Sequence, residues 1–189
     1  IGYSYEGVRD HGDILPKPMG SAGGMRRIQD FSGCFDETTL VLCGDALIDL
    51  DITAALAEHK AKGAIASVVA ADVPRQDVQA YGIVVAGEDG RIESFQEKPK
   101  PEDAKSTWAS TGIYIFEPEV LEKVPPDKLC DIGSELFPQL VAEKLPFYVQ
   151  KRPFHWLDIG RVSDYWSVLQ SVLKGEIADM KMPGKQIKP

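Results

Sequence analysis

The sequence predicts an α/β fold. A short apolar run at 40–43 is followed by a helical pattern at 52–60 and by a second apolar run at 64–71. A strand, a helix and a strand within about 30 residues are typical of a parallel crossover unit. Residues 81–86 and 91–96 instead flank a Glu-Asp-Gly turn, which predicts a β-hairpin and departs from a purely doubly wound sheet.

The N-terminal region is expected to contain a strand, a loop and a helix. Alternation of Ile1, Tyr3 and Tyr5 with small residues predicts the strand, whereas residues 7–19 lack periodicity and predict a loop. Small residues at 20–24 lead into the helix. They form either an ordinary helix start or a backbone surface flat enough for a planar base.

The run at 40–43 has the character of a fully buried strand that ends at Gly44 and Asp45. Ligands of open α/β sheets bind beyond the carboxyl ends of the strands, and a glycine there lets a phosphate or metal approach the backbone. We therefore expect Asp45 to be a metal ligand. Asp51 is expected to cap the following helix, and His59 on that helix is expected to face solvent.

The C-terminal half predicts further strands and helices in alternation. Residues 110–116 form a third apolar run, Asp131 begins a capped helix, and residues 147–150 form a short strand. The segment 155–160 repeats the apolar run followed by Asp and Gly. Residues 161–173 predict an amphipathic helix. The apolar residues expected to face the core are Val162, Tyr165, Trp166, Leu169 and Leu173.

Composition and charge exclude several classes of function. The 189 residues are enough for one domain, and the net charge of −8 argues against a broad surface for nucleic acid, although a small anionic substrate stays possible. Cys34, Cys43 and Cys130 form no C-x-x-C pair, so neither a disulfide framework nor a zinc site is indicated and a reducing cytoplasm fits best. Apolar runs are far shorter than the roughly 20 residues that span a bilayer, so no membrane partner is expected.

Two aspartates carry the strongest chemical signal. Asp45 and Asp158 each end an apolar run beside a glycine, and in one sheet their carboxylates would converge. Such a pair suits Mg²⁺, which takes one or two carboxylates plus substrate phosphates. Taken singly, each is more often a turn residue or a cap. Glu97 and Lys98 end the hairpin, where an ammonium suits a phosphate and a carboxylate suits sugar hydroxyls.

Six motifs of the sequence carry a resemblance to a known family. They are Gly20-Ser21-Ala22-Gly23-Gly24, Leu42-Cys43-Gly44-Asp45, Tyr81-Gly82, Phe95-Gln96-Glu97-Lys98-Pro99, Ser110-Thr111-Gly112-Ile113-Tyr114 and Trp156-Leu157-Asp158-Ile159-Gly160. These motifs occur in the order and approximate spacing of the sugar-phosphate nucleotidylyltransferases. The chain resembles the nucleotidyl transferase domain of the mannose-1-phosphate guanylyltransferase and glucose-1-phosphate adenylyl-, thymidylyl- and uridylyltransferase group. The resemblance implies a Rossmann-like α/β/α sandwich with a mixed, mostly parallel sheet and a β-hairpin excursion over residues 1–180. Residues 181–189 would lead towards a further C-terminal region such as a β-helix.

The resemblance also implies a reaction and roles for single residues. A sugar 1-phosphate would attack the α-phosphorus of an NTP, and pyrophosphate would leave. Asp45 and Asp158 would hold the Mg²⁺ cofactor, and Lys98 would bind the sugar phosphate. The NTP and the sugar 1-phosphate are the implied partners, and a homo-oligomer stays open. The other implied contacts are Gly20 with the base, Gly82, Glu97 and Gly112 with the sugar, and Asp131 nearby.

One departure from the family affects the expected activity. The glycine-rich signature Gly-x-Gly-x-Arg-Leu-x-Pro-Leu-Thr with a following Lys-Pro, which cradles the triphosphate, is not found in these residues. Lys17-Pro18 lies in a loop without the required arginine and glycines, so we assign it no role. The sequence is therefore expected to be a piece of a longer protein and to be inactive or impaired by itself.

Two alternative functions stay open. Asp49-Leu50-Asp51 matches the D-x-D pattern that glycosyltransferases of related fold use for a metal-bound nucleotide sugar. Against this, Asp51 already has a role as helix cap, and Glu97-Lys98 has no explanation. A non-catalytic regulatory or binding homologue would instead keep the fold and lack the triphosphate loop.

Overall fold

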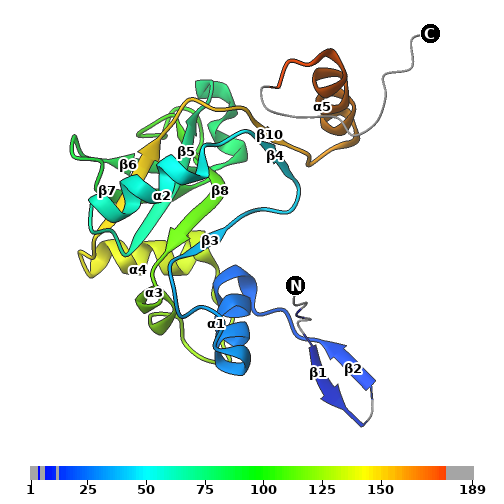
Figure 1. Ribbon diagram of the computed structural model, residues 1–189, viewed down its shortest axis with the longest axis vertical. Helices are drawn as coiled ribbons and strands as arrows, with labels where there is room; N and C mark the ends of the chain where they lie inside the picture. Colours follow the sequence, from blue (N-terminus) through cyan, green and yellow to red (C-terminus); the bar gives the residue numbers. More distant parts are fainter. Residues whose placement is uncertain (1–3, 5–6, 12, 178–189) are drawn as a thin grey trace.

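A mixed sheet organises the computed structural model, which describes residues 4, 7–11 and 13–177 (Figure 1). Six strands of the described residues form this sheet, in the order β7-β6-β8-β5-β9, with β3 paired to β8. The strands are β3 (Thr39–Val41), β5 (Ala66–Asp72), β6 (Gly82–Ala86), β7 (Ile92–Glu97), β8 (Trp108–Phe116) and β9 (Phe147–Lys151).

Strand β8 runs against its neighbours. It pairs antiparallel with β3, β5 and β6, while β9 pairs parallel with β5 and β7 pairs antiparallel with β6. Strands β3, β5, β6 and β9 therefore point in one direction among the described strands of this sheet. The predicted mixed sheet and its hairpin excursion are confirmed. The prediction that the sheet is mostly parallel is wrong for its pairings, because β8 lies antiparallel to β5 on one side and to β3 and β6 on the other, and β5-β9 is the one parallel pairing among the described strands of this sheet. The predicted crossover joins β3 and β5, which are parallel but separated by β8.

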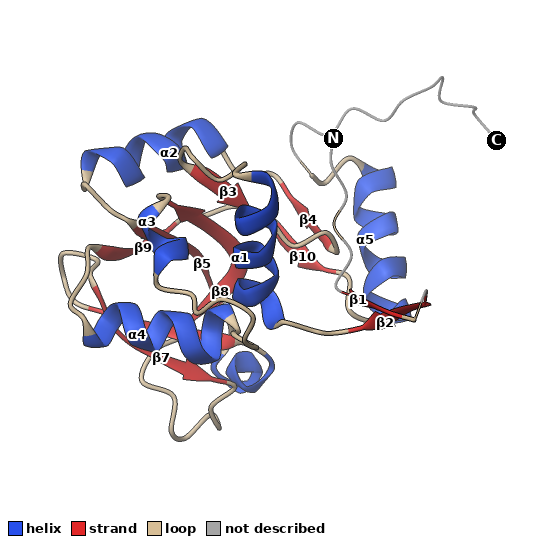
Figure 2. Cartoon of the chain, turned by 90° about the horizontal axis from the view of Figure 1, so that it is seen from below, coloured by secondary structure: helices blue, strands red, loops and turns tan. Residues whose placement is uncertain are grey.

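Helices cover both faces of the sheet. Ala66, Val68 and Ala70 of β5 pack into the main apolar core with residues of α1, α3 and α4. Ser67 points to the opposite face and contacts α2, so α2 and α4 lie on opposite sides of the strands (Figure 2). None of the helices in the described ranges has the length and apolarity needed to cross a membrane. The helices are α1 (Gly20–Ser32), α2 (Ile52–Ala61), α3 (Glu119–Glu122), α4 (Phe137–Ala142) and α5 (Val162–Lys174), with the 3₁₀-helix η1 (Arg75–Ala80) and the π-helix η2 (Ile132–Leu136).

The N-terminal region differs from the predicted loop. Residues 7–19 contain a hairpin of β1 (Gly7–Asp10) and β2 (Asp13–Pro16), which projects from the main sheet (Figure 1). Strands of four residues are too short to show a clear period, which is why the sequence pattern missed them. Of the strand predicted around Ile1, Tyr3 and Tyr5, only Ser4 is described, and it lies in no strand. The proposed lead-in at 181–189 lies outside the described residues.

The predicted central strand is shorter and less buried than expected. β3 ends at Val41, its residues are half-buried, and Cys43 to Asp45 are exposed. Its pairing within the described part of the chain is with β8 alone, so β3 is an edge strand there. An edge position leaves one side of the strand uncovered, which explains the partial burial.

The last helix presents a different face from the one predicted. Helix α5 lies beyond the two-stranded sheet of β4 (Ala46–Ile48) and β10 (Trp156–Asp158), away from the main sheet in both views (Figures 1 and 2). Val168 is buried, whereas Val162 and Trp166 are 87% and 62% exposed. The predicted core-facing stripe is therefore wrong, because α5 packs against β10 rather than across the main sheet. Tyr165 and Leu173 are exposed as well, and Leu169 is half-buried.

His59 is buried, contrary to the prediction that it faces solvent. Its side chain is 0% exposed, with Nδ1 2.8 Å from Ser67 Oγ and Nε2 3.0 Å from Glu117 Oε1. Glu117 also accepts a hydrogen bond of 2.8 Å from Thr38. Burial lowers the pKa of His59, and the hydrogen bond to Glu117 opposes this shift. A neutral ring thus links α2 to β5 and to the chain before α3.

The stability of the fold should depend on pH through His59. Its native pKa lies below the ordinary value of 6.5, so the unfolded chain binds more protons below about pH 6.5. The free energy of unfolding should be constant above this pH and fall as the pH decreases towards the native pKa. Urea denaturation of wild type and of His59→Gln at several pH values tests this.

His59→Gln should show a weaker fall in acid than wild type. An unchanged slope in His59→Gln would show that another group causes the acid sensitivity.

Candidate active site

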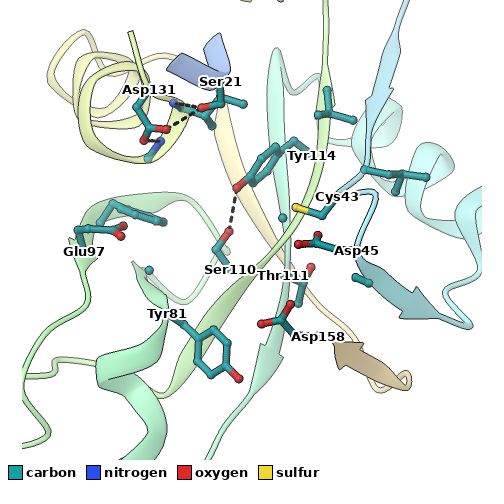
Figure 3. Close-up of a pocket in the computed structure, with 18 of the residues that line it drawn as sticks. Ser21, Cys43, Asp45, Tyr81, Glu97, Ser110, Thr111, Tyr114, Asp131 and Asp158 are labelled. Atoms are coloured by element: carbon teal, nitrogen blue, oxygen red, sulfur yellow. Dashed lines mark hydrogen bonds between the residues drawn. The ribbon is translucent and has the colours of Figure 1, made fainter. Parts of the chain in front are cut away.

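A cavity of about 550 Å³ opens where β4 and β10 meet the edge of the main sheet (Figure 3). Its walls come from the start of α1, the turn between β3 and β4, the ends of the β6-β7 hairpin, β8, β10 and the segment before η2. Gly20 is not among its lining residues. The predicted site residues that line it are Asp45, Gly82, Glu97, Lys98, Gly112, Asp131 and Asp158.

The two predicted metal ligands come together at this cavity. Pairing of β4 with β10 places Asp158 opposite Ala46, and the Ile159 N–H donates to the Asp45 carbonyl at 3.0 Å. Figure 3 shows both carboxylates in the same part of the cavity, next to Thr111. Within the described ranges, neither carboxylate takes part in a side-chain hydrogen bond or an ion pair. Two aspartates more than 100 positions apart in the sequence therefore lie at the same cavity, and both carboxylates are free to bind a ligand.

The acidic pair makes this rim electrostatically negative. Burial and the charges of Asp45 and Asp158 raise the pKa of the Cys43 thiol. Burial, followed by the charge of Asp158, raises the pKa of the Tyr81 hydroxyl. The described residues contain no group of three or more His, Cys, Asp or Glu side chains arranged to hold an ion. Two free carboxylates fit Mg²⁺ when substrate phosphates supply the other oxygen ligands.

Glu97 and Lys98 lie on the wall formed by the end of the hairpin. Both side chains are exposed, and the Lys98 ammonium is 3.8 Å from the Glu97 carboxylate, which is a loose pair that contributes little to stability. The Lys98 ammonium therefore stays available to a ligand.

Gly82 begins the neighbouring strand, β6. A Cβ at Gly82 would lie 2.3 Å from the Phe95 ring, so this close packing requires glycine.

Strand β8 is irregular where it lines the cavity. The β5-β8 register shifts between Val69 and Ala70, and Thr111 and Gly112 have no partner on β5. Gly112 has φ +73°, which favours glycine. A Cβ at Gly112 would lie 2.3 Å from the Cys43 sulfur, so this glycine also permits the approach of the β3-β4 turn.

Asp131 has a structural task that sequence reasoning identified only in part. One carboxylate oxygen accepts hydrogen bonds from the N–H groups of Gly133 and Ser134 at 2.9 and 3.0 Å, as expected of a cap. The other accepts one of 2.7 Å from the Ser21 hydroxyl, which itself accepts from the Ile132 N–H. Burial raises the pKa of Asp131, but these hydrogen bonds outweigh it and lower the pKa. Both oxygens are engaged, so Asp131 shapes the wall.

Gly20 packs α1 against the chain before η2. It has φ +74°, and a Cβ there would lie 2.6 Å from the Cys130 carbonyl oxygen. The Gly23 N–H donates to the same carbonyl at 2.9 Å, and a Cβ at Gly23 would lie 2.8 Å from the Lys128 carbonyl oxygen. These contacts explain both glycines structurally, and the contact of Gly20 with a base stays a prediction.

The D-x-D carboxylates are used by the fold. Asp49 accepts a hydrogen bond of 2.6 Å from the His155 N–H and lies 2.6 Å from the His155 ring nitrogen. Asp51 accepts from the Ala54 N–H at 2.9 Å, which confirms its predicted role as the N-cap of α2. Neither aspartate lines the cavity.

Several cavity residues received no role from the sequence. Tyr81 and Trp156 pack with ring centroids 5.0 Å apart and form one wall. Each lies within two positions of a predicted site residue. Membership in the same sequence motif was therefore the one indication that Tyr81 and Trp156 line the site. The other residues of this kind include Ser21, Phe95, Ser110, Thr111 and Tyr114.

Comparison with known proteins places this geometry in a family. The model of the family described as Nucleotidyl transferase matches residues 6–175. UTP--glucose-1-phosphate uridylyltransferase of Synechocystis sp. is 50% identical over 189 residues, covering 100% of this chain and 49% of that protein. Glucose-1-phosphate adenylyltransferase of Clostridioides difficile is 30% identical over 173 residues, covering 87% of this chain and 44% of that protein. The chain spans about half the length of these relatives.

A solved structure supports the fold. The crystal structure of HddC from Yersinia pseudotuberculosis complexed with GMP-PN aligns with a TM-score of 0.66 and 20% identity, covering 82% of this chain and 64% of that chain. At this identity the likeness shows the fold alone. It agrees with the α/β sandwich predicted from the sequence.

Replacing Gly112 should destabilise the cavity wall through two separable effects. Gly112→Ala should cost roughly 1–3 kcal/mol because alanine disfavours a positive φ, and more because its Cβ meets the Cys43 sulfur. Adding Cys43→Ala to the Gly112→Ala variant should restore only the stability that is lost through the contact with the Cys43 sulfur. Urea denaturation of the single and double variants measures this coupling.

Gly33→Ala is the matched control for the backbone effect. Gly33 has φ +63°, and a Cβ added there would meet nothing within 4 Å, so Cys43→Ala should not rescue it. Additive effects of Gly112→Ala and Cys43→Ala would contradict the contact.

Proposed function

This chain belongs to the nucleotidyl transferase family, and from that premise we propose that the protein is a sugar-1-phosphate nucleotidylyltransferase. The observation that carries the proposal is the pair of free carboxylates, Asp45 and Asp158, in a cavity that also holds Glu97 and Lys98. The names of the relatives make glucose 1-phosphate the first sugar to test, with UTP and then ATP as the nucleotide.

In the proposed reaction, a phosphate oxygen of the sugar 1-phosphate forms a bond to the α-phosphorus of the NTP. The bond from the α-phosphorus to the bridging oxygen breaks, and pyrophosphate leaves with that electron pair. The attacking phosphate is already an anion, so no general base is required. Alignment of the two oxygens and neutralisation of charge therefore supply most of the acceleration.

The residues of the chain divide these tasks between two sides of the cavity. Lys98 holds the sugar phosphate by charge, and the Glu97 carboxylate accepts hydrogen bonds from sugar hydroxyls. Gly112 contacts the sugar through its backbone, since the Cys43 sulfur fills the space that a side chain would take.

Asp45 and Asp158 would hold Mg²⁺ on the other side. A bound Mg²⁺ supplies neutralisation of triphosphate charge and orients the phosphates. Without a cation, the two carboxylates would repel a triphosphate, and this repulsion supports the cofactor proposal. We assign residues 1–180 to the nucleotidyl transferase domain and place the protein in a reducing cytoplasm, where soluble nucleotides and sugar phosphates occur.

The glycosyltransferase alternative is weaker because Asp49 and Asp51 are engaged outside the cavity. The deciding experiment incubates the full-length protein with Mg²⁺, UTP or ATP, and glucose 1-phosphate, and follows pyrophosphate. Release of pyrophosphate that depends on the sugar phosphate is expected. Consumption of an NDP-sugar without pyrophosphate from any NTP would favour a glycosyltransferase, and binding without turnover would favour a non-catalytic homologue.

Removing either carboxylate charge should abolish turnover. Asp45→Asn and Asp158→Asn should each lower kcat by about 100-fold or more with little effect on the melting temperature, because each removes charge stabilisation of the reacting phosphates. The matched control is Asp51→Asn, since asparagine is an equally good N-cap and turnover should persist. Loss of turnover in Asp51→Asn alone would support the D-x-D site instead.

Lys98→Ala should act mainly on the sugar phosphate. Loss of one charge-assisted hydrogen bond should raise the KM for glucose 1-phosphate by about 10- to 150-fold, with a smaller change in the KM for the NTP. Steady-state kinetics with each substrate varied in turn measures both constants. Equal changes in the two constants would place Lys98 elsewhere.

A further inference from the structure

We propose that Thr111 is a positioning residue that holds the irregular part of β8 in the shape needed to bind the sugar 1-phosphate. This inference rests on the proposed function. Thr111 is 2% exposed and lines the cavity, yet its hydroxyl is directed into the sheet rather than towards a ligand. Its effect on the substrate must therefore act through its neighbours.

The register of β8 defines the irregularity. Val69 of β5 lies opposite Ile113, and the next residue, Ala70, lies opposite Ser110. One position along β5 (69 to 70) therefore spans three along β8 (110 to 113). Two extra residues are accommodated in β8 as a β-bulge, which bends a strand and redirects its side chains.

The Thr111 hydroxyl links the two strands across this bulge. It donates a hydrogen bond of 2.8 Å to the carbonyl oxygen of Val69. Val69 is 0% exposed, so the bond lies in the sheet interior, where water does not compete. The side chain thus supplies an inter-strand hydrogen bond at the position where the regular backbone ladder shifts.

The bulge sets the position of Gly112. This residue directly follows Thr111, has φ +73° and packs against the Cys43 side chain on the cavity wall. Loss of the Thr111 hydrogen bond would let the bulge relax and shift the Gly112 backbone. Asp45 and Asp158 are held by the separate β4-β10 pairing, so the acidic side of the cavity should change less.

The hydroxyl group can be tested by two conservative substitutions. Thr111→Val keeps the branched shape and removes the donor, whereas Thr111→Ser keeps the donor. Thr111→Val should raise the KM for glucose 1-phosphate about tenfold, the loss expected for one hydrogen bond, and leave the KM for the NTP within about twofold. Thr111→Ser should restore the KM for glucose 1-phosphate.

Thr107→Val is the matched control. Thr107 precedes β8, donates a hydrogen bond of 2.5 Å to Asp72 and does not line the cavity. The same loss of a hydroxyl there should leave both KM values unchanged. Melting temperatures of all variants report any general loss of stability.

Calorimetric titration of glucose 1-phosphate into the full-length wild-type protein separates this inference from the proposed function. Absence of binding by wild type would refute the proposed function. Binding by wild type that is equally tight in Thr111→Val would overturn the positioning role alone, and so would equal rises in both KM values. If Thr111→Val does not fold, Thr111→Cys, a weaker donor, must raise the KM for glucose 1-phosphate, and a wild-type KM would overturn the proposal.

Discussion

The structure depends on β8 running antiparallel among β3, β5 and β6. This strand contributes the buried residues Ile113 and Ile115 to the core, and its pairings fix where β3 ends and where β6 begins. The β3 end leads to Asp45, and the β6 start carries Gly82. Three walls of the cavity therefore take their positions from one strand. A shift in the β8 register would move all three together, which makes this strand the main constraint on the site.

Local chemistry in the sequence predicted most elements of the fold but not their arrangement. The Asp-Gly turn of the hairpin and the Asp51 cap depend on adjacent residues, and both were predicted. The direction of β8, the burial of His59 and the exposed face of α5 depend on elements far away in the chain. The sequence shows that α5 is amphipathic, but it does not show that the helix lies beyond β10 and not on the main sheet.

Site residues could be predicted from the sequence where a side chain that can bind a ligand directly follows a predicted strand. Asp45 and Asp158 were recognised because each ends an apolar run beside a glycine, at the strand ends where ligands of α/β sheets bind, and the β4-β10 pairing brings them together. Thr111 carried no comparable signal, because its hydroxyl bonds to the carbonyl of a residue on another strand. Gly20 and Asp131 were selected for ligand contacts, yet each has a packing or capping role that only the three-dimensional contacts reveal.

The cavity has a rigid side, which carries Asp45 and Asp158, and a side that carries the exposed Lys98 side chain. The acidic pair is held by a backbone ladder, which suits groups whose spacing must match one small cation. Lys98 is exposed and only loosely paired, so its long side chain can follow a phosphate over several positions. The proposed reaction needs both properties, because phosphates must be held firmly at the reacting bond while the incoming sugar is first captured and then aligned.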